Sequence, residues 1–284
     1  MIRLGTVFYK LTGSGNDFIA LDGRHVRPED VDASSIRAIC DRRHGAGADG
    51  LMLLQPAPGS DLHFRFLFWN RDGSPGPMCG NGALCATRLA VVLEFAPPEG
   101  KVRFATDAGV HRGWVVGENQ SEIELPDCDL PVPASGLPVV RGESSPMVAA
   151  PSVPHVVLEV PDVDAVDLDL RGPVLRRDAS LGAGGANVNW VSAGTEPSVW
   201  RMRTFERGVE GETLACGTGA VASALSLVQR GKAQPPVTIT TRSGKPLVVS
   251  FRPEGGQAKS IRLRGEGRIV YRAILESIPT IAGD

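Results

Sequence analysis

Residues 78–92 read M-C-G-N-G-A-L-C-A-T-R-L-A-V-V, and residues 215–229 read A-C-G-T-G-A-V-A-S-A-L-S-L-V-Q. When Cys79 is aligned with Cys216, two glycines and an alanine that follow each cysteine also coincide. A run of mostly apolar or small residues comes next in both stretches. A helix that is apolar on every side must be surrounded by protein. The pattern therefore indicates a duplicated element, in which a glycine-rich turn leads into a buried helix.

Each repeat places a cysteine at the expected beginning of its helix. The first backbone N–H groups of a helix have no partner within the helix, and the positive end of the helix dipole lies there. This environment favours a thiolate over a thiol and attracts anions. We therefore expect two half-sites, one at Cys79 and one at Cys216, that face one ligand.

The bulk composition limits the class of protein. The chain has 284 residues, of which 42% are apolar, and its net charge is −2. This length allows two domains with full cores, and this charge argues against a basic nucleic-acid-binding face. The N-terminus lacks the pattern of a signal peptide, and no apolar run reaches the roughly 18 residues of a membrane span. We expect a cytoplasmic protein that binds neither nucleic acid nor membrane.

The five cysteines form neither a disulfide framework nor a metal site. They are Cys40, Cys79, Cys85, Cys128 and Cys216. An odd number of scattered cysteines without a C-x₂-C pair is typical of thiols in a reducing compartment. We expect Cys40, Cys85 and Cys128 to be small buried hydrophobic residues. Cys79 and Cys216 differ because both occupy the same place in the repeat, and we predict no metal.

The remaining sequence is mostly short strands. Strands are expected at 2–9, 17–22, 51–54, 62–69, 101–106, 109–116, 121–125, 155–160, 187–192, 198–206, 236–241, 246–252 and 267–273. Helices are expected at 32–43, with Asp32 as the N-cap, and at 164–177, where Pro173 disrupts the second half. The G-x-G-x-x-G at 45–50 follows a helix and precedes a strand, which is the reverse of a dinucleotide-binding fingerprint.

These elements predict a mixed α/β (α+β) fold of two similar domains. In each domain a curled, mainly antiparallel sheet would wrap around one central helix. The proline-rich stretch 125–138 is the expected linker.

Two opposed thiols suit the inversion of a stereocentre, which needs a base on one face of a carbon and an acid on the other. The N–H groups of Gly80-Asn81 and Gly217-Thr218 would hold a substrate carboxylate and stabilise the charge that develops as the α-proton leaves. Neither a pyridoxal lysine motif nor a metal cluster is apparent, so we expect no cofactor.

Several motifs of this chain together resemble those of the diaminopimelate epimerase family. The members of this family are cofactor-independent enzymes of bacterial lysine and cell-wall synthesis. The matching segments are Gly13-Ser14-Gly15-Asn16-Asp17-Phe18, Gly47-Ala48-Asp49-Gly50, Asn70-Arg71-Asp72-Gly73-Ser74, Met78-Cys79-Gly80-Asn81-Gly82, Pro154-His155, Asn187-Val188-Asn189, Glu206-Arg207-Gly208 and Cys216-Gly217-Thr218-Gly219. They span nearly the whole chain in the family's order.

The resemblance implies two pseudo-symmetric domains, which we place at 1–126 and 127–267, with the C-terminal strand 268–284 returning to the first domain. It implies Cys79 and Cys216 as the two bases and an amino-acid substrate with two charged ends. The implied ligand contacts are Asn16, Asn70, Gly80, Asn81, Asn187, Glu206, Arg207, Gly217 and Thr218. His155 stays outside the expected catalytic set, and a homodimer is left open.

Two positions depart from the family's pattern. Many members have Gly-Asn-Pro-His where this chain has Ser152-Val153-Pro154-His155, and Leu84 replaces a usual arginine. The first departure removes an amide that touches the distal end of the substrate. A racemase or epimerase of another amino acid on the same fold is therefore one alternative. A thiol redox or small-molecule-binding protein, in which Cys79 and Cys216 form a disulfide, is another.

Overall fold

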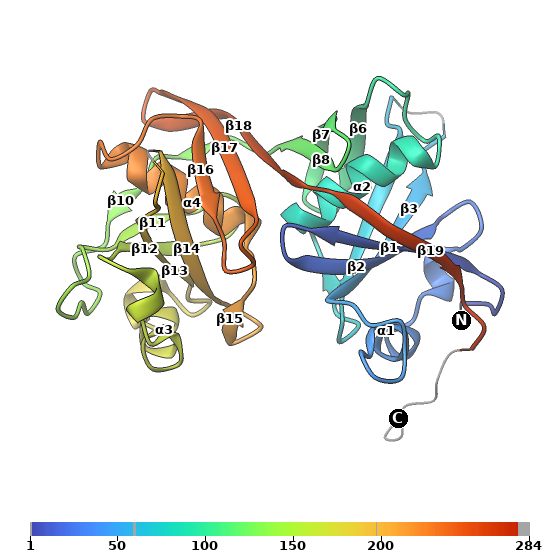
Figure 1. Cartoon of the computed structure of the whole chain (residues 1–284), viewed down its shortest axis with the longest axis horizontal. Coiled ribbons are helices and arrows are strands. Elements are labelled where there is room, and N and C mark those ends of the chain that lie inside the picture. The colour runs from blue at the N-terminus through green and yellow to red at the C-terminus, as the bar shows by residue number, and fades with distance from the viewer. Residues whose placement is uncertain (1, 59–60, 197, 278–284) are drawn as a thin grey trace. The chain divides into compact units, whose positions relative to one another are not determined.

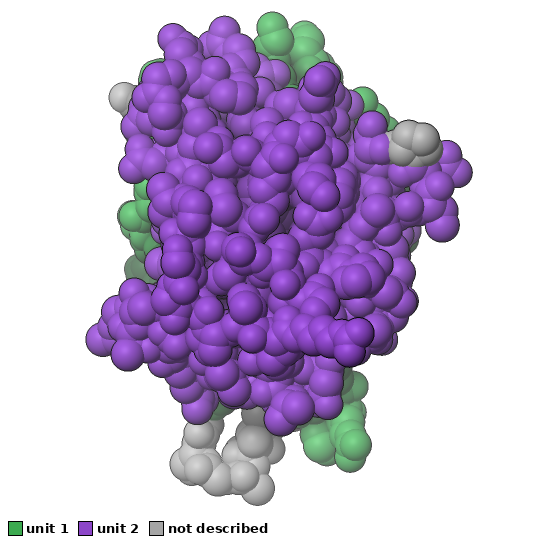
Figure 2. Space-filling model, turned by 90° about the vertical axis from the view of Figure 1, so that its left-hand side faces the viewer, with its two compact units in different colours: residues 1–123, 265–284 green, residues 124–264 purple. Residues whose placement is uncertain are grey.

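The computed structural model describes residues 2–58, 61–196 and 198–277. The chain forms two compact units, coloured separately in Figure 2. Unit 1 comprises Met1–Ile123 and Gly265–Asp284, and unit 2 comprises Glu124–Arg264. Unit 1 is therefore discontinuous in sequence, and unit 2 is inserted into it.

Unit 1 contains two α-helices and a curled sheet. Its elements are β1 (Val7–Gly13), β2 (Asn16–Asp22), the 3₁₀-helix η1 (Pro28–Asp30), α1 (Ala33–Cys40), β3 (Gly50–Pro56), β4 (Phe64–Asn70), β5 (Pro75–Gly76), α2 (Gly80–Val92), β6 (Lys101–Thr106), β7 (Gly109–Gly117), β8 (Gln120–Glu124), whose last residue belongs to unit 2, and β19 (Arg268–Ile274).

Unit 2 repeats this plan. Its elements are β9 (Cys128–Asp129), β10 (Val132–Pro133), β11 (Met147–Ala149), β12 (His155–Glu159), η2 (Val163–Ala165), α3 (Leu168–Arg176), η3 (Ala179–Leu181), β13 (Asn187–Ala193), β14 (Val199–Glu206), β15 (Gly211–Thr213), α4 (Gly217–Gln229), β16 (Val237–Thr240), β17 (Pro246–Glu254) and β18 (Gln257–Glu266), which ends in unit 1.

The strand pairings of the two units correspond one to one. In unit 1, β1 and β2 are antiparallel, β2 and β3 parallel, β3 and β4 antiparallel, β4 and β6 parallel, and β6 and β7 antiparallel. In unit 2, the same sequence of pairings joins β11, β12, β13, β14, β16 and β17. The predicted duplication and the mixed α/β fold with curled, mainly antiparallel sheets are thus confirmed.

Each unit is organised around one long helix, α2 or α4, which its strands surround (Figure 1). Nearly every side chain of α4 is buried, and so is most of α2, as the apolar repeats predict. Cys79 and Cys216 are the N-cap residues, with matching extended backbones at φ −127° and −133°. The duplication therefore extends to the local geometry of the two cysteines.

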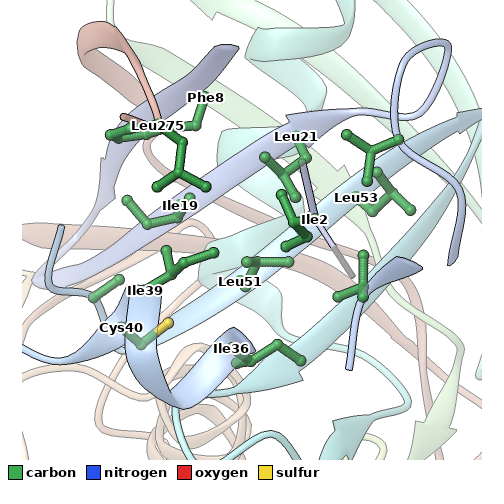
Figure 3. Packing of buried hydrophobic residues seen from close by; sticks show 13 residues of the cluster. Ile2, Phe8, Ile19, Leu21, Ile36, Ile39, Cys40, Leu51, Leu53 and Leu275 are labelled. Carbon is green, nitrogen blue, oxygen red and sulfur yellow. The ribbon is translucent and has the colours of Figure 1, made fainter. Parts of the chain in front are cut away.

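A hydrophobic cluster in unit 1 joins α1 to the sheet (Figure 3). Ile36, Ile39 and Cys40 of α1 pack in one cluster with Ile19 of β2 and Leu51 of β3. Asp32 caps this helix as predicted, because its side chain accepts from the N–H of Ser35. Burial raises the pKa of the Cys40 thiol to about 12, so Cys40 acts as a hydrophobic residue.

The first hairpin differs from the prediction. We expected one strand at 2–9 and the next at 17–22, but β1 continues to Gly13, which pairs with Asn16. Ser14 and Gly15 both have positive φ, at 51° and 118°, and close the hairpin as a two-residue turn. Asn16 is therefore the first residue of β2 and lies outside the turn.

The prediction missed strand β18 and misjudged one helix. In β18, Ala258 and Ile261 are buried three positions apart, and Ser260 between them has a positive φ of 53°. Buried and exposed side chains therefore do not alternate along this strand as they do in a regular strand. The helix expected at 164–177 divides into η2 and α3, and Pro173 lies inside α3. The stretch 125–138, the expected linker, directly follows the boundary between the units at Ile123 and Glu124. It contains two short strands, since β9 pairs with β18 and β10 pairs with β11.

The C-terminal strand β19 pairs antiparallel with β1, from Val7 opposite Ile274 to Thr12 opposite Arg268. Residues 278–284, which we included in the returning segment, lie outside the described residues. None of the helices in the described part of the chain has the length and apolar character of a membrane span.

Candidate active site

The first half-site lies at the N-terminus of α2. Cys79 is half-buried, and its Sγ accepts a hydrogen bond from the N–H of Gly82 at 3.4 Å. The N–H donor and the helix dipole both favour negative charge on this sulfur. Gly80 and Asn81 are the first two helical residues, where backbone N–H groups lack helical partners.

Two predicted residues meet beside Cys79. The Nδ2 of Asn81 donates to the Oδ1 of Asn16 at 2.8 Å, and the Nδ2 of Asn16 donates to Asp49 Oδ2 at 3.0 Å. Asn70 lies at the end of β4, and its amide donates to Ser74 Oγ within its own turn at 3.1 Å. The structure therefore unites Asn16 and Asn81 with the helix end, whereas the amide of Asn70 bonds locally.

The second half-site lies at the N-terminus of α4. The Sγ of Cys216, which is buried, lies 3.6 Å from Thr218 Oγ1. His155, the first residue of β12, places its Nε2 2.9 Å from the same hydroxyl. Thr218 thus connects the imidazole of His155 to the sulfur of Cys216, and His155 belongs to this half-site although sequence reasoning left it out.

Asn189 determines which ring nitrogen of His155 carries the proton. Its Oδ1 accepts from the Thr204 hydroxyl at 2.9 Å, and its Nδ2 donates to the carbonyl of Val156 at 3.1 Å. The orientation of this amide is therefore fixed, and its Nδ2 also lies 3.1 Å from His155 Nδ1. The Nδ2 of Asn187 lies farther away, 3.4 Å from Nε2. The shorter contact makes Nδ1 the acceptor, so Nε2 carries the hydrogen and donates to Thr218.

This arrangement makes Thr218 a donor to sulfur. Because Thr218 Oγ1 accepts from His155, its own hydrogen is available for Cys216 Sγ. Burial, with a smaller contribution from the charge of Arg207, lowers the pKa of His155 to about 3. His155 is therefore neutral near pH 7 and orients Thr218 without adding charge.

The remaining predicted residues surround this centre in unit 2. Asn187 begins β13, and its Oδ1 accepts from the N–H of Arg207 at 2.8 Å. Glu206 ends β14, and its Oε2 accepts from the Thr213 hydroxyl at 2.8 Å. The guanidinium of Arg207 lies near the loop that contains Gly184. These contacts fix the backbone of Arg207 beside a buried polar network.

Three residues of these networks were missed by sequence reasoning, namely Asp49, His155 and Asn189. A usable signal existed for Asn189, because Asn187 and Asn189 are two positions apart and so share one face of β13. A buried face that carries two amides requires polar partners.

Each of the two helix ends combines a thiol with hydrogen-bond donors. Each sulfur receives or can receive a hydrogen bond, from a backbone N–H at Cys79 and from a hydroxyl at Cys216. Each helix end also offers N–H groups to an anion. Among the described residues, no group of three or more His, Cys, Asp or Glu side chains is placed to hold a metal ion.

Comparison with known proteins agrees with these features. The model of a family described as diaminopimelate epimerase matches residues 8–124 and 148–268. The chain is 41% identical over 274 residues to the diaminopimelate epimerase of Gemmatimonas aurantiaca, covering 93% of this chain and 97% of that protein. It is 37% identical over 267 residues to that of Chlorobaculum tepidum, covering 93% and 99%.

Solved structures with lower identity share the fold. A probable proline racemase from Agrobacterium radiobacter matches with a TM-score of 0.67 at 16% identity, covering 98% of this chain and 93% of that one. A predicted epimerase from Pseudomonas aeruginosa matches with a TM-score of 0.69 at 17% identity, covering 96% and 99%. Taken with the two helix-capping cysteines, the family match and the sequence relatives show that this chain belongs to the diaminopimelate epimerase family.

Proposed function

We propose that the protein is an isomerase that inverts one α-carbon of diaminopimelate, converting the LL to the meso form for lysine and peptidoglycan precursor synthesis. The observation that carries this proposal is the pair of cysteine-capped helices, α2 and α4, in a chain whose relatives carry this activity by name. Cys79 and Cys216 are the proposed catalytic residues, and no cofactor is required.

In the proposed mechanism one sulfur is a thiolate and the other a thiol. The thiolate takes the α-proton, so that the C–H bond breaks, an S–H bond forms and the electron pair stays on the substrate carbon. The thiol then gives its proton to the opposite face of that carbon, which forms the new C–H bond and leaves a thiolate. The two cysteines exchange roles when the reaction runs in reverse.

The helix ends would stabilise the carbanion. N–H groups of Gly80, Asn81, Gly217 and Thr218 would bind the α-carboxylate, where negative charge increases as the proton leaves. Exclusion of water strengthens these contacts, since both Asn81 and Gly217 are buried.

The other proposed contacts recognise the charged groups of the substrate. Arg207 suits a carboxylate because its planar guanidinium can donate two parallel hydrogen bonds. Glu206 suits an ammonium, and amides such as Asn16, Asn70 and Asn187 can bind either group. An amino acid with two charged ends matches this set better than one with an apolar side chain.

Single substitutions test the two-base scheme. Cys79→Ala and Cys216→Ala should each abolish epimerisation of LL-diaminopimelate by the reduced protein, measured by chiral chromatography. Cys128→Ala is the matched control, because Cys128 lies on β9 outside both half-sites, and this variant should keep full activity. Substantial turnover by either active-site variant would refute the scheme.

A second candidate is the epimerisation or racemisation of another amino acid. It is favoured by Val153, which stands where many family members carry an amide. Exchange of the substrate α-hydrogen with solvent deuterium, measured for a panel of amino acids by mass spectrometry, distinguishes the two. Diaminopimelate should exchange fastest, and faster exchange of a monocarboxylic amino acid would favour the alternative.

We also propose a cytoplasmic location and a homodimer. Reactive thiols need a reducing compartment. Strand β19 leaves Val270, Tyr271 and Ile274 about half exposed, and Ile274 lies opposite Val7, which is also about half exposed. Exposed apolar residues of this kind suit contact with a second copy. Light scattering over a range of concentrations should give twice the 30.0 kDa mass of the chain. A monomer at every concentration would refute the homodimer.

A further inference from the structure

The motif Gly47-Ala48-Asp49-Gly50 contains a carboxylate that the proposed mechanism does not use. Asp49 Oδ2 accepts from Asn16 Nδ2 at 3.0 Å and from the N–H of Asp17 at 3.3 Å. Its Oδ1 accepts from Arg42 Nη2 at 2.7 Å, and Arg42 also pairs with Asp17. Asp49 is thus held by donors on both oxygens.

This carboxylate fixes the orientation of two amides in series. A carboxylate at neutral pH only accepts hydrogen bonds, so the side of Asn16 that faces Asp49 must be its NH₂ group. The Oδ1 of Asn16 then faces Asn81 and accepts from Asn81 Nδ2 at 2.8 Å. The polarity of Asn81 follows, because its NH₂ group is directed to Asn16 and its Oδ1 is directed elsewhere.

The last atom of this hydrogen-bonded series is Asn81 Oδ1, a buried acceptor that receives no hydrogen bond from the described residues. Asn81 is 2% exposed, and its Oδ1 has no hydrogen-bond partner in the described structure. An unsatisfied buried acceptor costs about 1–3 kcal/mol, which a ligand donor would recover. Turning the amide over would not help, since it would place two oxygens against each other at Asn16.

We infer that Asp49 is a positioning residue that acts through Asn16 and Asn81, so that Asn81 Oδ1 accepts from the substrate ammonium. This inference rests on the proposed function. An α-amino acid carries a carboxylate, an ammonium and a hydrogen on one carbon. Cys79, the N–H groups after it and Asn81 Oδ1 offer one complementary group to each.

The second half-site has a different group at the equivalent position. Thr218 is the second residue of α4, as Asn81 is of α2, and its hydroxyl accepts from His155. That hydroxyl is therefore turned toward Cys216 as a donor and does not suit an ammonium. Recognition of the ammonium on the reacting α-carbon thus falls to the first half-site, and Glu206 is left for the distal ammonium.

The test compares diaminopimelate with pimelate, the dicarboxylate of the same chain length without ammonium groups. Asp49→Asn keeps the size of the side chain but can present either a donor or an acceptor to Asn16. This variant should raise the KM for diaminopimelate about tenfold or more, the effect of losing one hydrogen bond to a charged group. Its kcat should stay within about threefold, and the inhibition constant of pimelate should not change.

The control is Asp107→Asn, the same chemical change at an exposed ion pair with Arg65 in unit 1. Asp107→Asn should change neither the KM for diaminopimelate nor the inhibition constant of pimelate. Asn81→Ala should reproduce the selective loss for diaminopimelate, and its combination with Asp49→Asn should add no further loss, because the two residues act in series.

An unchanged KM in Asp49→Asn, or equal weakening of diaminopimelate and pimelate, would overturn the inference. If Asp49→Asn does not fold, Asn81→Ala is the decisive variant. If the KM for diaminopimelate and the inhibition constant of pimelate keep their wild-type ratio in that variant, Asn81 does not contact the ammonium. A wild-type protein that does not epimerise diaminopimelate would instead overturn the proposed function.

Discussion

At the scale of single residues, His155 illustrates how burial sets the chemistry of a half-site. The imidazole is 0% exposed and hydrogen-bonds to Thr218 and Asn189, while burial and Arg207 lower its pKa to about 3. A charged imidazole would donate from both nitrogens and so would lose its bond from Asn189. The half-site therefore depends on a neutral ring with one defined tautomer.

This low pKa predicts a loss of stability in acid. In the unfolded chain His155 titrates near 6.5, so between pH 6.5 and 3 the unfolded state binds more protons than the folded state. The free energy of unfolding should fall by about 1.4 kcal/mol per pH unit in that range from this group. Urea titrations at pH 7 and 5 should show a loss about 2 kcal/mol larger in wild type than in His155→Gln. An equal fall in the free energy of unfolding in wild type and His155→Gln would contradict the low pKa of His155.

The two equivalent glycines of the repeats should respond differently to the same substitution. A Cβ on Gly219 would lie 2.5 Å from Asn189 Oδ1, whereas a Cβ on Gly82 would lie 3.3 Å or more from its neighbours. Gly219→Ala should therefore displace Asn189, lower kcat at least tenfold and cost about 2 kcal/mol of stability. Gly82→Ala, the matched control, should cost less than 1 kcal/mol in thermal unfolding. Equal losses of stability in Gly219→Ala and Gly82→Ala would contradict the close contact between Gly219 and Asn189.

The candidate site could be predicted where the motif itself defines the geometry. Cys79 and Cys216 cap their helices because the following glycines begin each helix, and Asn16 and Asn81 meet as expected of one half-site. Asp49 could not be assigned from sequence, because its role depends on which strand end faces which helix end. That information is three-dimensional.

At the scale of elements, α3 is attached to unit 2 by a buried ion pair. Glu143 accepts from Arg171 Nε at 3.1 Å and Nη2 at 2.7 Å, and from Trp190 Nε1 at 3.0 Å. Burial alone would raise the pKa of Glu143, but the hydrogen bonds from Arg171 and Trp190 hold it below its usual value. The carboxylate thus stays charged and joins α3 to β13 and the loop before β11.

Removal of this carboxylate should destabilise unit 2. Glu143→Ala would leave the largely buried guanidinium of Arg171 without its anion, at a cost of about 3 kcal/mol or more. Urea unfolding monitored by tryptophan fluorescence measures this loss. Asp107→Ala, which breaks an exposed ion pair, should change stability by less than 1 kcal/mol. Similar losses in both variants would refute the structural role.

Element prediction succeeded where the sequence periodicity was regular. The two central helices and α1 were found because apolar or small residues occupy their buried faces. Strand β18 was missed because the pairing of β17 with β18 is irregular between Ser250 and Arg252, which breaks the alternation of buried residues. The short strands β5, β9, β10 and β15 are defined by their neighbours and carry little local signal.

At the scale of the whole molecule, unit 1 depends on β19, which follows unit 2 in the sequence. β19 covers β1, and Leu275, which is 9% exposed, belongs to the cluster of Figure 3. A chain that ends at Gly267 should lose amide protection in unit 1 but keep it in unit 2, measured by hydrogen exchange with mass spectrometry. Arg272→Ala, at an exposed position of β19, is the control and should change neither. Uniform loss or retention in both units would contradict this dependence.

The insertion of unit 2 within unit 1 also sets the order in which the two units can be completed during translation. As the nascent chain leaves the ribosome, residues 1–123 emerge before residues 124–264, yet their sheet lacks β19 until residues 268–274 are translated. Residues 124–264 are continuous, so the domain made later can be completed earlier. The helix α2 therefore reaches its finished surroundings only after α4. A chain that stops between residues 264 and 268 would contain all of unit 2 but would lack β19 of unit 1.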